Sequence, residues 1–262
     1  MDKIYDQLVK GLKKFSARTG IKRAVLGLSG GVDSAVSAVL AAEAFGAGNV
    51  YGLAMPARYT SALSNDAAAR LAGNLGINFT AQPIGPAFNL LRAQLKKDFA
   101  AGPAPITEQN LQARLRGVII MAFANQLKAA ALATGNRSEI YTGYCTLYGD
   151  TVGAIAPLAN LYKTEVFALA RHINRRKEII PAVTITRAPT AELAPNQKDS
   201  DELLPYGQLD IIIEEYVFKK SPLTQICRKA KVSKAHAQRI IKKIDGSAFK
   251  RGQLPPAIEI KK

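Results

Sequence analysis

The segment LGLSGGVDSAV, residues 26–36, combines residue types that bind phosphate. An apolar run leads into a Ser-Gly-Gly turn, and a second apolar run follows it. A turn that opens a helix presents backbone N–H groups at the positive end of the helix dipole, which attracts anions. Gly30 and Gly31 allow the backbone to approach a phosphate closely, and Ser29 and Ser34 add hydroxyl donors. The segment predicts a phosphate-binding loop, although it lacks the Gly-Lys-Ser/Thr ending of the common nucleoside-triphosphatase loop.

Asp33 indicates which phosphate chemistry the loop serves. A carboxylate repels phosphates unless a cation lies between them, and Mg²⁺ held by a carboxylate and phosphate oxygens fills that place. A tight turn with a capping aspartate is the alternative interpretation of the same residues. The apolar runs on both sides and the two serines favour a metal-bridged triphosphate site.

The segments around the loop alternate between strand and helix patterns. An apolar run at 24–28 predicts a buried strand, and an Ala-rich helix is expected from about Asp33 to Phe45. Two further strands, at 49–56 and 78–84, flank a helix at 64–76. The alternation predicts an α/β fold, a doubly wound, Rossmann-like parallel sheet flanked by helices, with ligands at the carboxyl ends of its strands.

Three other segments have clear patterns. Residues 3–18 predict an amphipathic helix whose apolar stripe packs either on the core or on a second subunit. Residues 107–133 predict one long helix that leads into the loop TGNRSE at 134–139. Residues 180–206 are rich in Pro, Asp and Glu and have no helix or strand period. We predict that they form a mobile lid, of which residues 191–205 become ordered when substrates bind.

Composition limits the class of protein. A chain of 262 residues that is 48% hydrophobic predicts one soluble domain over residues 1–262. The two cysteines, Cys145 and Cys227, are far apart and predict reduced thiols without a zinc site. Neither a membrane span nor a secretory signal is evident, so we expect a cytoplasmic protein. The 36 Lys and Arg outnumber the 20 Asp and Glu, and the net charge of +16 favours partners such as nucleotides, pyrophosphate or RNA.

The loop SGGVDS, residues 29–34, resembles the signature of the ATP pyrophosphatases of the adenine-nucleotide α-hydrolase-like fold. Those enzymes cleave ATP between the α and β phosphates and adenylate an oxygen of a second substrate. Further stretches resemble the NAD synthetase family of that superfamily: NLQARLR (110–116), TGNRSE (134–139), LYKTEV (161–166), PTAEL (189–193) and KRGQLPP (250–256). The resemblance implies ATP-dependent amidation of deamido-NAD to NAD through an acyl-adenylate, with ammonia as nitrogen donor and AMP and pyrophosphate as products.

The resemblance also implies roles for individual residues. Asp33 and Glu139 are expected to ligate Mg²⁺, and Lys163 and Asp33 are expected to act electrostatically, without an acid–base catalyst. The residues expected to contact deamido-NAD are Asn110, Arg114, Asp150 and Lys250. The residues expected to bind ATP are Gly27, Leu28, Ser29, Gly30, Gly31, Val32, Asp33, Ser34, Met55, Thr134, Lys163 and Thr190.

Three positions depart from the pattern of the ammonia-dependent family members. Leu147 replaces a substrate-binding lysine, Ala154 replaces an aspartate that contacts the substrate, and Phe249 replaces the polar residue before the C-terminal lysine. The stretch GYCTLYGD, residues 143–150, is closer to the synthetase half of the glutamine-dependent enzymes.

The nitrogen source and the assembly are also expectations from this resemblance. The motifs fill the chain from near residue 26, so we expect no amidohydrolase domain. Ammonia would then come from solution, with a separate glutaminase as the alternative source. The resemblance further implies a homodimer with its substrate sites at the interface.

Two other functions fit parts of the sequence. A tRNA-modifying ATP pyrophosphatase would use the same loop to adenylate a base, but neither an RNA-binding extension nor a thiol-transfer cysteine near the loop is evident. Residues 223–244 resemble two short helices around a turn, the pattern of a helix-turn-helix nucleic-acid module. In the NAD synthetase family the corresponding region packs as part of the domain, so we do not expect nucleic acid as a partner.

Overall fold

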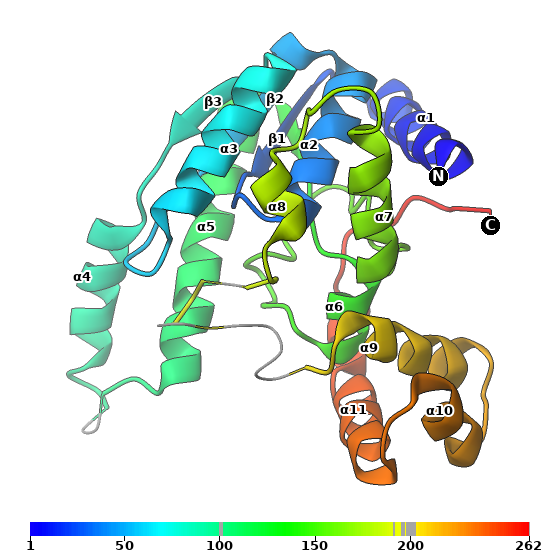
Figure 1. Ribbon diagram of the computed structural model, residues 1–262. Coiled ribbons are helices and arrows are strands. Elements are labelled where there is room, and N and C mark those ends of the chain that lie inside the picture. Colours follow the sequence, from blue (N-terminus) through cyan, green and yellow to red (C-terminus); the bar gives the residue numbers. More distant parts are fainter. Residues whose placement is uncertain (100–101, 191, 195–196, 198–202, 262) are drawn as a thin grey trace.

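A four-stranded parallel sheet lies at the centre of the computed structural model, which describes residues 1–99, 102–190, 192–194, 197 and 203–261 (Figure 1). Its strand order is β3-β2-β1-β4. Strands β2 and β3 are therefore added on one side of β1, and β4 is added on the other side. A crevice at such a reversal of strand order is the usual ligand site of an open α/β sheet. The strands are β1 (Arg23–Gly27), β2 (Val50–Ala54), β3 (Asn78–Ala81) and β4 (Ala129–Ala131).

Apolar helices cover one face of this sheet. The helix that follows the glycine loop is buried along most of its length, because Ala, Val and Leu occupy nearly all of its sides. Leu8, Leu12 and Phe15 of the first helix are buried in the same cluster, so the predicted apolar stripe serves the core and not a second subunit. The helices that contribute to this cluster are α1 (Asp2–Thr19), α2 (Val32–Phe45), α3 (Ala62–Leu75), α7 (Lys163–Ile173) and α8 (Ala182–Thr186).

The other face of the sheet is covered by α5 (Pro105–Leu127), which packs beside α4 (Gly85–Leu95). Ile120 and Ala124 of α5 are buried against Val25 of β1 and Leu53 of β2. Helices therefore lie on both faces of a parallel sheet, which confirms the predicted α/β class.

A separate apolar cluster holds the C-terminal helices together, and Figure 1 shows them gathered at one end of the molecule. Ile226, Ala237 and Ile240 are buried in it beside residues of α9. The two helices predicted within 223–244 are present, and their apolar faces are used in this packing. The helices of this region are α6 (Arg137–Thr142), α9 (Tyr206–Ile213), the π-helical turn η3 (Glu214–Phe218), α10 (Leu223–Ala230), α11 (Lys234–Gly246) and α12 (Ala248–Arg251).

Strand β4 corrects the prediction of one helix over 107–133. The helix ends at Leu127, because Lys128 takes a left-handed conformation with φ of 50°. Ala129–Ala131 then pairs in parallel with Arg23–Val25 of β1. Alanine has the highest intrinsic helix propensity, so a run of alanines predicts helix wherever tertiary pairing does not decide otherwise. The main-chain pairing with β1 decides it here.

Part of the predicted lid, residues 191, 195, 196 and 198–202, lies outside the described residues. Helix α8 occupies Ala182–Thr186 in the segment expected to lack regular structure. No helix in the described part of the chain combines the length and apolar character that a bilayer crossing requires.

Gly30 is required by both conformation and space. Its φ is +75°, and a Cβ at this position would lie 2.4 Å from the carbonyl oxygen of Ser64 in α3. We expect Gly30→Ala to lower the free energy of unfolding by about 3 kcal/mol, because backbone strain and a main-chain clash add together. Urea unfolding measures this loss. Gly20→Ala is the matched control, because Gly20 has φ of +74° and open space, and should cost only about 1 kcal/mol. Equal losses in the two variants would show that the contact with Ser64 is unimportant.

Candidate active site

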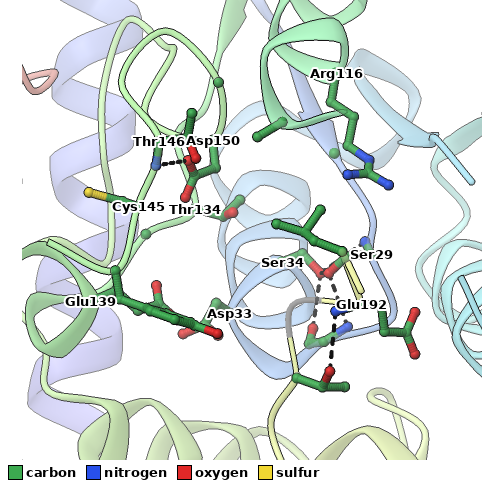
Figure 2. A pocket seen from close by; sticks show the side chains of 18 of the residues that line it. Ser29, Asp33, Ser34, Arg116, Thr134, Glu139, Cys145, Thr146, Asp150 and Glu192 are labelled. Carbon is green, nitrogen blue, oxygen red and sulfur yellow. Dashed lines mark hydrogen bonds between the residues drawn. The ribbon is translucent and has the colours of Figure 1, made fainter. Parts of the chain in front are cut away.

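A cavity of about 480 Å³ lies beyond the carboxyl ends of β1 and β2, where several loops meet (Figure 2). Its walls come from the glycine loop, one side of α5 and several residues between 143 and 152. The described residues Thr184, Arg187, Pro189, Thr190, Glu192, Leu193 and Gln197 complete them. The fold thus collects segments that are far apart in sequence around one space. The predicted residues that line the cavity are Gly27, Leu28, Ser29, Gly31, Val32, Asp33, Ser34, Met55, Asn110, Thr134, Glu139, Asp150, Lys163, Thr190 and Lys250.

Hydrogen bonds within the glycine loop fix its shape. The Ser34 hydroxyl donates to the Gly31 carbonyl at 2.9 Å, and the Ser29 N–H donates to the Ser34 hydroxyl at 3.3 Å. The Gly31 N–H donates in turn to the Ser29 hydroxyl at 3.2 Å. Helix α2 begins at Val32, so its first turn faces the cavity with the positive end of the helix dipole. The loop is therefore a preformed site for an anion.

Asp33 and Glu139 converge on the ammonium group of Lys163. Lys163 Nζ donates to Asp33 Oδ2 and, at 3.0 Å, to Glu139 Oε1. Asn136 Nδ2 donates to Asp33 Oδ1 at 2.8 Å, and Asn136 forms a reciprocal capping box with Glu139 at the start of α6. These groups come from α2, α6 and α7, and Figure 2 shows the Asp33 and Glu139 carboxylates directed toward each other.

The surroundings of Glu139 favour its neutral form when no further cation is present. Burial raises the pKa of the Glu139 carboxyl to about 7, Lys163 opposes this rise, and the charge of Asp33 adds to it. Two carboxylates that face each other in a partly buried site are stabilised by a nearby cation. The electrostatics of the pair therefore suit a site that takes up positive charge.

The same oxygens suit a divalent cation with hard oxygen ligands. Mg²⁺ in proteins is usually bound by one or two carboxylates together with substrate phosphates and water. Among the described residues, no group of three or more His, Cys, Asp or Glu side chains could hold a metal ion. What the described residues bring together is a pair of carboxylates, those of Asp33 and Glu139, beside the glycine loop.

The loop 143–150 on the opposite wall is held by its own polar side chains. The Thr146 N–H donates to Asp150 Oδ1 at 2.6 Å, as Figure 2 shows, and the Thr146 hydroxyl donates to Asn110 Oδ1 at 2.7 Å. Lys250 Nζ donates to the carbonyl oxygens of Gly143 and Cys145 at 2.8 and 2.6 Å. Burial raises the pKa of the Asp150 carboxyl to about 6. Asn110, Asp150 and Lys250 are thus joined through this one loop.

Arg116 lines the cavity, whereas Arg114, the residue expected to contact deamido-NAD, does not. Arg116 Nε donates to the Met55 carbonyl at 3.0 Å, and Figure 2 shows its side chain reaching from α5 toward the cavity. Burial lowers the pKa of Arg116 to about 10. Arg114 is exposed and donates to the Leu147 carbonyl at 3.2 Å. Asn110, Ala113 and Arg116 follow one another at intervals of three residues, so neighbouring members lie on adjacent positions of the helix surface. This spacing is the signal that could have identified Arg116 as a residue of the cavity wall.

Glu192 is another polar residue of the cavity wall that sequence reasoning missed. Its Oε1 accepts from the Ser61 and Ser64 hydroxyls at 2.9 and 2.7 Å. Arg187 donates to the Ser64 hydroxyl at 2.7 Å. Thr190, two positions before Glu192, accepts from the Glu192 N–H at 3.2 Å. The carboxylate therefore ties the segment that carries Thr190 to the start of α3, against which Gly30 packs.

The substituted positions lie in different surroundings. Leu147 receives a hydrogen bond from Arg114 through its main chain. The Ala154 N–H donates to the Ala131 carbonyl at 2.8 Å, beside the end of β4. Phe249 is 62% exposed. None of the three lines the cavity formed by the described residues.

Known proteins are similar to this chain in sequence and in fold. The sequence model of the NAD synthase family matches residues 4–255. The glutamine-dependent NAD(+) synthetase of Synechocystis sp. is 40% identical over 259 residues, which are 99% of this chain and 46% of that protein. The chain spans about half the length of the curated relatives it matches.

Two solved structures extend the comparison. The glutamine-dependent NAD+ synthetase of Acinetobacter baumannii, in complex with ADP, is 36% identical with a TM-score of 0.69, covering 98% of this chain and 47% of that one. The NMN synthetase of Francisella tularensis is 29% identical with a TM-score of 0.81, covering 95% of both chains. Because the family match extends over nearly the whole chain and includes every wall of the cavity, this chain belongs to the NAD synthase family.

Proposed function

We propose that this chain catalyses the ATP-dependent amidation of deamido-NAD to NAD, with ammonia as nitrogen donor and AMP and pyrophosphate as products. The observation that carries the proposal is the convergence of Asp33, Glu139 and Lys163 beside a preformed anion loop. A carboxylate is a poor electrophile, so amidation requires one of its oxygens to become a leaving group. Adenylation by ATP does this, and a site for a metal-bound triphosphate is what such a reaction needs.

In the proposed mechanism the residues act by position and charge. The nicotinate carboxylate attacks the α-phosphorus of ATP and displaces pyrophosphate, and ammonia then attacks the acyl-adenylate and expels AMP. Mg²⁺ held by Asp33 and Glu139 would neutralise charge on the phosphates. Lys163 and the N–H groups of the glycine loop stabilise the charge that develops on the phosphate oxygens. Arg116 and Lys250, on the other walls, supply positive charge for the dinucleotide substrate.

Free ammonia is the proposed nucleophile, whatever its source. Release of ammonia from glutamine by covalent catalysis requires a thiolate or another activated nucleophile. Burial raises the pKa of the Cys145 thiol, which lies in the cavity wall, to about 12. Cys145 therefore stays a thiol at neutral pH and does not fit the role of a nucleophile that releases ammonia from glutamine.

We also propose that the chain works as a homodimer, as its family resemblance implies. Val118 and Met121, three residues apart on α5, are 66% and 37% exposed and leave apolar surface on this helix for a second subunit to cover. Arg116 on the same helix reaches the cavity, so an α5 interface would lie close to the substrates.

The test is a product assay with ATP, Mg²⁺ and ammonium. We expect NAD, AMP and pyrophosphate in equal amounts from deamido-NAD, and the Asp33→Asn variant supplies the background. Glutamine replaces ammonium in a parallel reaction. A reaction with nicotinic acid mononucleotide belongs beside it, because one structural relative is named an NMN synthetase. Formation of ADP and phosphate would contradict the proposed chemistry, and exclusive use of the mononucleotide would contradict the proposed acceptor.

A further inference from the structure

Asp210 is a buried carboxylate that joins three helices behind the phosphate site. It lies on α9 and is only 6% exposed. Its Oδ1 accepts a hydrogen bond from the Ser138 hydroxyl of α6. Its Oδ2 accepts from the Thr164 N–H at 3.1 Å and from the Thr164 hydroxyl at 2.7 Å, both at the start of α7. One carboxylate therefore receives three donors from the two helices that carry Glu139 and Lys163.

The hydrogen bonds continue from Asp210 to the main chain of Lys163. The Lys163 N–H donates to the Ser138 hydroxyl oxygen at 2.9 Å. Because Ser138 accepts from Lys163, its own proton is directed to Asp210. Ser138 is adjacent to Glu139, so this chain of hydrogen bonds fixes the helix starts that present both charged side chains.

Helix α9 also reaches the other end of Lys163. The ring of Tyr206 lies 5.3 Å from the Lys163 ammonium nitrogen. Tyr206 and Asp210 are four residues apart and so lie on one face of α9. Asp210 on this face binds Ser138 and Thr164, which lie next to the main chain of Lys163. Tyr206 on the same face contacts the charged end of the Lys163 side chain. The position of α9 and the position of the ammonium group are thereby linked.

The three donors around Asp210 match an ionised carboxylate, and they oppose the rise in its pKa that burial causes. Both oxygens of Asp210 act as acceptors, and no donor is needed from the side chain. An asparagine has one acceptor oxygen and one NH₂ group, so it would place a donor against Ser138 or against Thr164. In a buried site such a conflict moves the groups apart, because no water replaces the lost partner.

We propose that Asp210 is a positioning residue that holds Lys163 and Glu139 in register for binding and activating MgATP. This role rests on the proposed function only for the identity of the second substrate. Asp210 has no place in the cavity wall and does not touch the reacting atoms. It acts through Ser138 and Thr164, and it connects the C-terminal helical cluster to the phosphate site.

The test compares Asp210→Asn with Glu215→Gln. Glu215 is a second buried carboxylate of the same helical cluster, 3% exposed, and its partners Lys219, Ser221, Gln225 and Lys229 all lie within that cluster. Three quantities are measured: thermal unfolding, MgATP affinity by calorimetry, and the kcat and KM of NAD formation. For Asp210→Asn we expect MgATP affinity to fall about tenfold and kcat to fall about thirtyfold, with the KM for deamido-NAD nearly unchanged. For Glu215→Gln we expect a similar loss of thermal stability with MgATP affinity and kcat within about twofold of the wild type.

Ser138→Ala provides a second route that keeps the carboxylate and breaks the link to Lys163. It should weaken MgATP binding as well, and its effect should not add to that of Asp210→Asn, because both remove one linked chain of hydrogen bonds. If Asp210→Asn changes only thermal stability, as Glu215→Gln should, or if Ser138→Ala leaves MgATP affinity unchanged, the positioning role is wrong. A wild-type protein that binds MgATP but forms no NAD would remove the proposed function. The calorimetric comparison would still decide the role of Asp210.

Discussion

Replacing Lys163 by methionine should reduce kcat for NAD formation by about a thousandfold, or about 4 kcal/mol of transition-state stabilisation. Lys163 is 4% exposed, and its ammonium contacts Asp33 and Glu139 beside the phosphate loop. Methionine keeps most of the side-chain volume and removes only the charge and its donors. The loss would therefore report on phosphate stabilisation more than on packing.

The control for this variant is Lys229→Met, which removes a lysine that pairs with Glu215 at 2.8 Å outside the cavity. We expect its kcat to stay within about twofold of the wild type. Thermal unfolding of both variants separates misfolding from lost catalysis. A Lys163→Met protein that folds and keeps a tenth or more of its activity would show that Lys163 only neutralises the carboxylates.

Local sequence patterns were sufficient to predict the first half of the site. The strand, glycine loop and helix around Asp33 follow one another directly, so an apolar run, two glycines and an Ala-rich segment identify them. Glu139 and Lys163 could be selected only through the family resemblance. The contacts of Lys163 with Asp33 and Glu139 depend on how α6 and α7 fold back over the sheet, which no local pattern encodes.

The features that the sequence did not predict all depend on tertiary packing. Ala129–Ala131 is a strand because β1 offers it main-chain partners, which outweighs the helix propensity of alanine. Arg116 lines the cavity because of the rotation of α5 about its own axis. A motif with two nearby arginines does not determine that rotation, so it does not show which arginine faces the cavity. Asp210 has no distinctive sequence context, and only the meeting of α6, α7 and α9 reveals its partners.

The raised pKa of Glu139 predicts different effects of this residue on activity and on stability. Burial raises the pKa of Glu139 from its ordinary value of 4.5 to about 7, so between these values the folded state binds more protons than the unfolded state. The contribution of Glu139 to the free energy of unfolding therefore falls as pH rises through this range, by at most about 1.4 kcal/mol per pH unit. A cation bound by the carboxylate would reverse that loss, which is why the residue is better suited to binding a metal than to holding the fold together.

Glu139→Gln should accordingly lose about a thousandfold or more in kcat and yet be at least as stable as the wild type at about pH 8 without metal. Glutamine cannot ionise, so urea unfolding with a chelator present should show that the variant lacks the fall in stability between about pH 5 and pH 7. Glu43→Gln, an exposed carboxylate on α2, is the control and should retain both the wild-type rate and the wild-type pH profile. A Glu139→Gln variant that keeps its rate would remove Glu139 from the metal site. If it instead loses both rate and stability at high pH, the carboxylate is ionised and structural in the metal-free protein, and the site is organised by the Lys163 ion pairs before any substrate arrives.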